Sequence, residues 1–92
     1  WLPNVPELAA QGFITGASAR NWQAYGEHIT LDPAVTETQR GMLTDPQTSG
    51  GLLVSCSADV ADQVLALFHE QGFEYARVIG QVTEGKAGVT VK

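Results

Sequence analysis

The chain has 92 residues, the length of one domain or part of one, and a hydrophobic fraction of 43% that suits one modest core. Ten acidic and five basic side chains give a formal charge of −5, which argues against a nucleic-acid partner or an anionic membrane surface, because both require a basic face. The chain has no apolar run long enough for a transmembrane helix. Its two histidines are well separated, which excludes a zinc site. Its single cysteine, Cys56, cannot form an internal disulfide, which favours a reducing cytoplasm.

The first half of the chain predicts short helices joined by irregular segments. Pro6 suits the first turn of the first helix, and Gly12 suits the residue just past its end. Thr15 or Ser18 is a suitable N-cap for the second helix, which we expect Gly26 to end. The predicted elements are helices over 6–11, 17–25 and 37–43 and an extended segment over 28–31.

The second half predicts the order strand, helix, strand, turn, strand. Residues 51–56 are an apolar run of strand length between glycines and polar residues. Ser57 and Gly72 suit the two ends of a helix over 58–71, whose apolar residues recur at helical spacing. Further strands are predicted over 76–82 and 89–91, with a turn over 83–88. This order predicts an α+β or α/β layer, with the helix packed on one face of a small sheet.

The polar, glycine-rich turn before residue 52 carries the most specific signal. Pro46 disfavours a helical conformation at Asp45, whose carboxylate is placed to accept a bond from the amide of Gln47 or Thr48. Glycines permit a positive φ or a close approach of another chain, and exposed amides and hydroxyls suit an anion. The alternative is a plain helix-to-strand connection whose glycines let the next strand pack tightly. The candidate binding residues are Asp45, Thr48, Ser49, Gly50 and Gly51.

A family resemblance begins at this turn. The string Asp45-Pro46-Gln47-Thr48-Ser49-Gly50-Gly51-Leu52-Leu53 resembles a signature near the C-terminus of selenophosphate synthetases, or selenide, water dikinases. The resemblance continues upstream over 11–18 with Arg20-Asn21, and downstream over 78–82. It implies that residues 1–92 are part of the C-terminal domain of such an enzyme, with 1–44 irregular or helical and 45–92 strand–helix–strand–strand. It also implies a fold like the C-terminal domain of aminoimidazole ribonucleotide synthetase.

The resemblance further implies the reaction of the parent enzyme. Members of this family convert selenide, ATP and water to selenophosphate, AMP and phosphate with the help of Mg²⁺, and dimerise mainly through the N-terminal domain. The turn over 45–51 is then expected to line the nucleotide cleft from the C-terminal side. The family's reactive Cys or selenocysteine, its partner Lys and its metal-binding Asp residues lie upstream and have no counterpart here. We therefore expect no catalytic or metal-binding residue, no bound cofactor and no activity in this chain alone.

Two other functions stay open: a stand-alone interaction module, and a superfamily relative that acts on a purine or thiamine intermediate. Cys56 ends an apolar run with no neighbouring cation, so a buried, inert thiol is expected rather than a selenium-handling one. Because the chain opens on Trp1-Leu2-Pro3, without an initiator Met or a signal peptide, we expect it to be a piece of a longer protein. Such a piece should expose apolar area and be prone to dimerise, swap or unfold.

Overall fold

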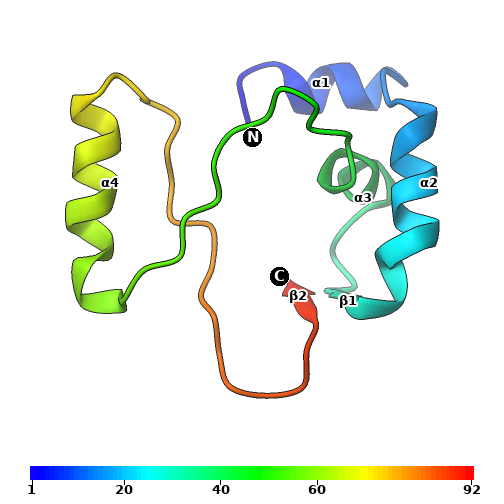
Figure 1. Cartoon of the computed structure of the whole chain (residues 1–92). Coiled ribbons are helices and arrows are strands. Elements are labelled where there is room, and N and C mark those ends of the chain that lie inside the picture. Colours follow the sequence, from blue (N-terminus) through cyan, green and yellow to red (C-terminus); the bar gives the residue numbers. More distant parts are fainter. The chain divides into compact units, whose positions relative to one another are not determined.

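The computed structural model describes all 92 residues and divides them into two units. The first unit comprises Trp1–Gly50 and Gly85–Lys92, and the second comprises Gly51–Glu84. The first unit contains α1 (Val5–Ala10), α2 (Gly16–Tyr25), the 3-10 turn η1 (Gly26–His28), β1 (Ile29–Leu31), α3 (Glu37–Leu43) and β2 (Val89–Val91) (Figure 1). The second contains the 3-10 turn η2 (Ala58–Val60) and α4 (Ala61–Glu70).

Helices α1 and α2 confirm the predicted helices, with small differences at their ends. Pro6 lies in the first turn of α1, and Gly12 follows its C-cap with a φ of +93°. Thr15 occupies the N-cap position of α2, but its side chain makes no capping hydrogen bond. Gly26 ends α2 in a right-handed conformation, and the chain continues directly into η1. A Cβ on Gly26 would lie 2.9 Å from the indole of Trp22, so the residue is small because of this packing.

Helix α3 covers the predicted residues, and a capping box explains its sharp start. The amide of Gln39 donates to Thr36 Oγ1 at 3.2 Å, and the amide of Thr36 donates to Gln39 Oε1 at 2.8 Å. Two orphan donors of the first turn are thereby satisfied. The helix contacts both α1 and α2, and Gly41 allows it to approach Ile14 closely, since a Cβ there would lie 3.0 Å from that side chain.

The sheet of the first unit is a parallel pair of two strands, β1 and β2. Ile29 is paired with Val89 and Leu31 with Val91, and Figure 1 shows the two strands side by side. Both strands lie where the sequence predicts extended structure, but their pairing joins distant parts of the chain. Side chains of α2, α3 and both strands line an apolar hollow of about 150 Å³. This hollow lies between the helices and the sheet, and the one fully buried apolar side chain of the unit is Ala9 of α1, so its core is very small.

Helix α4 confirms the predicted helix of the second unit. Its half-buried side chains recur at helical spacing and form one apolar stripe: Val60 in η2, then Ala61, Val64, Leu65 and Phe68. Gly72 follows the helix with a φ of +89°, and its amide donates to the carbonyl of His69 at 3.0 Å. The amide of Phe73 donates to the carbonyl of Phe68 at 3.0 Å, which completes a Schellman motif. The two phenyl rings pack edge to face, 5.8 Å between centroids.

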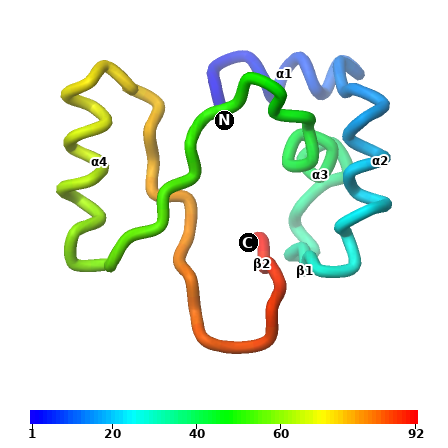
Figure 2. The backbone as a smooth tube through the Cα atoms, in the orientation of Figure 1, coloured from blue at the N-terminus to red at the C-terminus, as the bar shows by residue number.

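The strands predicted over 51–56 and 76–82 are wrong for this structure. Both segments run as backbone without a strand partner (Figure 2). A strand is stabilised by hydrogen bonds to a neighbour, and neither segment has a neighbour in this chain. Cys56 is exposed for the same reason, so its predicted burial is also wrong. Helices with a two-stranded sheet still confirm the α+β class. That the helix over 58–71 packs on a sheet stays a prediction.

Candidate functional site

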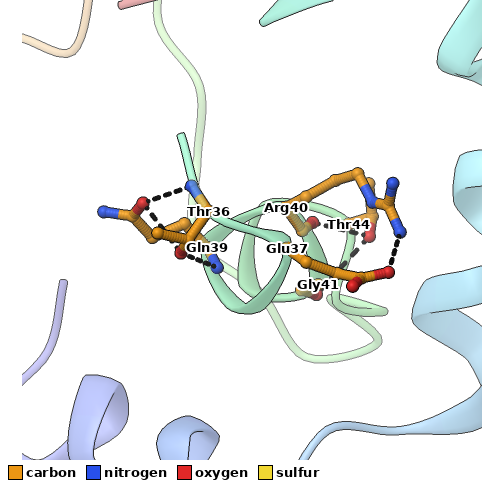
Figure 3. A network of polar contacts seen from close by, with 6 residues as sticks. All are labelled: Thr36, Glu37, Gln39, Arg40, Gly41 and Thr44. Carbon is orange, nitrogen blue, oxygen red and sulfur yellow. Dashed lines mark hydrogen bonds and ion pairs between the residues drawn. The ribbon is translucent and has the colours of Figure 1, made fainter. Parts of the chain in front are cut away.

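A network of polar contacts holds the end of α3, from which the candidate turn departs. The hydroxyl of Thr44 donates to the carbonyl of Arg40 at 3.0 Å and lies 3.4 Å from that of Gly41. The Arg40 guanidinium donates to Glu37 Oε1 at 2.9 Å. Figure 3 shows these contacts together with the capping box on one short helix. Both ends of α3 are therefore fixed by side-chain hydrogen bonds, and the turn has a defined starting point.

The same helix end is tied to α2 by two further contacts. Asn21 Nδ2 donates to the carbonyl of Thr44 at 2.8 Å, across 23 residues of sequence. The Arg40 guanidinium lies 5.1 Å from the centre of the Trp22 ring, a cation–π distance. Sequence reasoning missed the role of Asn21. The sequence did contain an indication of this role: Asn21 is a polar residue of low helix propensity, yet it lies inside a predicted helix and in the segment that resembles the family.

The turn itself differs from the predicted arrangement in two ways. Asp45 Oδ2 accepts from the side-chain amide of Gln47 at 3.3 Å, and no backbone amide of the turn bonds to it, so the predicted Asx-type bond is wrong. Gly50 and Gly51 do not adopt positive φ, so of the two possibilities for these glycines only a close approach of other chain atoms remains. The amide of Gly50 donates to the carbonyl of Gln47 at 3.1 Å, and a Cβ on Gly50 would lie 2.7 Å from Gln47 Cβ. Gly50 is thus required by the tightness of its own turn.

The exposed donors of this turn are the feature that bears on function. Thr48 and Ser49 are exposed, and no hydrogen bond within the chain uses their amides or hydroxyls. Asp45 is half-buried at the start of the turn. Gly51 opens the second unit, and no atom lies within 4 Å of the place that a Cβ would take. In the first unit the structure therefore brings Asp45, Thr48, Ser49 and Gly50 into one turn whose free N–H and O–H groups suit an anion.

A second hollow of about 190 Å³, lined by polar and apolar side chains, adjoins the same helix end, between α2 and α3. Ser18, which is 2% exposed, lies in its wall with its Oγ 3.5 Å from Thr15 Oγ1. Arg40 and Glu37 also line the hollow, but they are paired with each other, so the hollow presents no free charge of either sign. It therefore gives a weaker indication of a ligand than the turn does.

Two further kinds of feature, a metal centre and a membrane-spanning helix, find no support in this structure. His, Cys, Asp and Glu residues nowhere gather in threes at distances that suit a metal ion. None of the four α-helices has the length and apolar character that spanning a bilayer requires.

Comparison with known proteins identifies related sequences. Residues 2–92 match the family model described as AIR synthase related protein, C-terminal domain. The chain is 56% identical over 90 residues to a selenide, water dikinase of Pseudomonas straminea, which covers 98% of this chain and 25% of that protein. It is 55% identical over 91 residues to the protein of the same name from Paraburkholderia xenovorans, and this match covers 99% of this chain and 26% of that protein.

A more distant relative extends the comparison. A selenide, water dikinase of Rhizobium meliloti is 44% identical over 84 residues, covering 91% of this chain and 24% of that protein. The chain thus spans about a quarter of the length of the curated relatives that it matches. The resemblance first seen in the string from Asp45 to Leu53 is confirmed over nearly the whole chain.

Proposed function

The chain belongs to the family of AIR synthase related proteins through their C-terminal domain, and from this premise we propose that it is part of a selenide, water dikinase. One observation carries the proposal: identities of 44–56% to proteins of that name extend along nearly the whole chain. The parent enzyme makes selenophosphate from selenide, ATP and water and releases AMP and phosphate. The 92 residues supply part of its C-terminal domain and none of its reactive groups.

The chemistry divides between this chain and the rest of the parent. Mg²⁺, when bound, neutralises phosphate charge, and it prefers carboxylate oxygens. This chain offers no cluster of carboxylates, so its residues do not fit the ion. A phosphate needs N–H and O–H donors, which Thr48 and Ser49 offer free in an exposed turn. The proposal therefore assigns the turn with Asp45, Thr48, Ser49, Gly50 and Gly51 to the phosphate side of the nucleotide cleft, and Mg²⁺ to the other part.

The parent is a homodimer, and its reactive Cys or selenocysteine lies outside these 92 residues. Cytoplasmic location is supported by a single cysteine, which is free and exposed. Nucleic acid is not a partner, because a formal charge of −5 repels phosphate backbones.

The experiment that tests the function measures AMP release by the full-length protein with and without selenide. The expected result is AMP production that depends on both ATP and selenide, with selenophosphate as the product. ATP turnover driven by a purine or thiamine intermediate would instead identify a superfamily relative. A gene that encodes nothing beyond these residues would support a stand-alone interaction module.

The turn is tested by Thr48→Ala in the full-length protein. Loss of one hydrogen bond to a charged phosphate costs about 1.5 kcal/mol, so the KM for ATP should rise about tenfold while the unfolding midpoint is unchanged. Thr90→Ala is the matched control, because Thr90 is an exposed threonine in β2, away from the turn in sequence. If Thr48→Ala and Thr90→Ala have the same KM as the unchanged enzyme, the turn serves packing instead of binding.

A further inference from the structure

One hydrogen bond joins the starting point of the candidate turn to another helix. Asn21 Nδ2 in α2 donates to the carbonyl of Thr44, the C-cap residue of α3, at 2.8 Å. No other side-chain hydrogen bond of the chain joins residues more than seven positions apart. Asn21 and Thr44 are both half-buried, so water competes less for this bond than it does at an exposed position. Asn21 can therefore act on a segment that lies 23 residues further along the chain.

All other hydrogen bonds of the turn and of its starting point are local. The amide of Asp45 donates to the carbonyl of Met42 in α3 at 3.3 Å. Within the turn, Gln47 Nε2 donates to Asp45 Oδ2, and the amide of Gly50 donates to the carbonyl of Gln47. These bonds shape the turn, but they do not tie it to any element except α3. The bond from Asn21 is the only one that does.

This bond fixes the direction in which the chain leaves α3. The peptide group between Thr44 and Asp45 is planar, so a held carbonyl oxygen also sets the orientation of the Asp45 amide. One residue later, the ring of Pro46 holds its φ at about −65°. The held peptide and the proline ring together narrow the paths by which the chain can reach Thr48. Asn21 thereby restricts the position of the turn without being part of it.

The turn depends on position because it has no free charge beside it. The Arg40 guanidinium lies 2.9 Å from Glu37 Oε1 and 5.1 Å from the centre of the Trp22 ring, so it holds α3 against α2. What remains for a phosphate is the set of N–H and O–H groups of Thr48 and Ser49, which no hydrogen bond within the chain uses. Neutral donors of this kind bind well only when they are held within about 0.5 Å of the required geometry.

We propose that Asn21 is a positioning residue for the candidate turn: through the carbonyl of Thr44 it holds the donors of the turn where the phosphates of ATP can accept from them. The inference rests on the proposed function, which assigns this turn to the phosphate side of the nucleotide cleft. Loss of the Asn21 side chain then weakens ATP binding although Asn21 does not contact ATP. A merely structural role would lower the stability of the protein and leave its affinity for ATP unchanged.

Calorimetric titration of the full-length protein with a non-hydrolysable ATP analogue and Mg²⁺, without selenide, tests the proposal. Asn21→Ala removes the donor without adding a charge, and the dissociation constant for the analogue should rise about fivefold. The matched control is Gln23→Ala, which removes an exposed amide from the same helix that forms no hydrogen bond. It should leave the dissociation constant unchanged. Thermal unfolding of both variants verifies that they are folded at the temperature of the titration.

The route of the effect is tested by combining Asn21→Ala with Thr48→Ala. Thr48→Ala alone should raise the dissociation constant about tenfold, because one hydrogen bond to a charged phosphate is lost. Adding Asn21→Ala to that variant should raise it by less than about a further twofold, since changes that act through one shared contact are not additive. If the two single effects multiply in full, Asn21 acts on the nucleotide by another route and the proposal is wrong.

Two other results would also overturn it: an unchanged dissociation constant in Asn21→Ala, or an equal loss of affinity in Gln23→Ala. The proposed function has a separate readout, the release of AMP in the presence of selenide. A protein in which Asn21→Ala weakens analogue binding as expected, but which releases no AMP with selenide, disproves the proposed reaction alone. A protein that releases AMP with selenide and binds the analogue equally well with and without Asn21 disproves the positioning role alone.

Discussion

The two units of this molecule share the same local chemistry and differ in what surrounds it. Helix α1 in the first unit and helix α4 in the second both end on a glycine in the left-handed region, Gly12 at +93° and Gly72 at +89°. In both, the amide of this glycine and the amide of the residue after it make the two bonds of a Schellman motif. Yet β1 and β2 pair in the first unit, whereas 51–56 and 76–82 remain unpaired in the second. Helices and their caps form from nearby residues, while strands depend on partners that the nearby sequence does not contain.

The largest expected effect comes from a charge placed in an unpaired segment. We expect the rest of the full-length parent to cover Ile79, so Ile79→Glu should destabilise the parent by about 3–5 kcal/mol by burying a carboxylate without a partner. In the 92-residue chain, where Ile79 is 80% exposed, the same change should alter stability by less than about 0.5 kcal/mol. Denaturant unfolding of both proteins measures the contrast.

The control for this substitution is Gln63→Glu. It adds the same charge on an exposed position of α4 in the same unit and should be nearly neutral in both proteins. Equal, small effects of Ile79→Glu in the parent and in the short chain would mean that segment 76–82 is exposed to water in both. The lack of strand pairing in the second unit would then be a property of the parent as well.

Comparison of prediction and structure leads to the same distinction between local and distant determinants. The helix predicted over 37–43 has the predicted bounds, and its start is fixed locally, by a capping box that Thr36 and Gln39 form within four residues. The parallel pairing of Ile29 with Val89 was not predicted, since hydropathy patterns mark strands and not their neighbours. The candidate turn was placed correctly after α3, but the hydrogen bond of Asp45 to the Gln47 side chain was missed. Side-chain and backbone amides of one turn compete for the same carboxylate, and spacing does not decide between them.

The next prediction compares the two Schellman glycines directly. Gly12→Ala and Gly72→Ala should each cost about 1–2 kcal/mol, because a Cβ is unfavourable in the left-handed region and no neighbour lies within 4 Å of either position to add a clash. Unfolding followed by tryptophan fluorescence measures the first change, since Trp22 lies in the first unit, and amide exchange of α4 measures the second. Gly80→Ala is the control, with no positive φ and no neighbour within 4 Å. If Gly72→Ala leaves α4 exchange unchanged, the helix end of the second unit is not held by its own motif.

The smallest expected effect tests the contact that distinguishes the first unit, the hydrogen bond from Asn21 to the carbonyl of Thr44. Asn21→Asp keeps the side-chain shape and has a similar helix propensity, but it replaces the N–H donor with a carboxylate oxygen facing that carbonyl. Loss of one partly buried bond should destabilise the first unit by about 1 kcal/mol, read from the Trp22 signal on denaturant unfolding.

Gln23→Glu makes the same amide-to-carboxylate change two residues further along α2, where the side chain is exposed and forms no hydrogen bond. The difference between the two variants therefore isolates the tertiary contact from charge and propensity. Amide exchange in α4 should respond to neither variant. If Asn21→Asp and Gln23→Glu unfold at the same denaturant concentration, the bond to Thr44 adds nothing to the first unit. The stability of that unit would then derive from the β1–β2 pairing and the packing of Trp22, and the end of α3 would need no hydrogen bond from α2 to present the candidate turn.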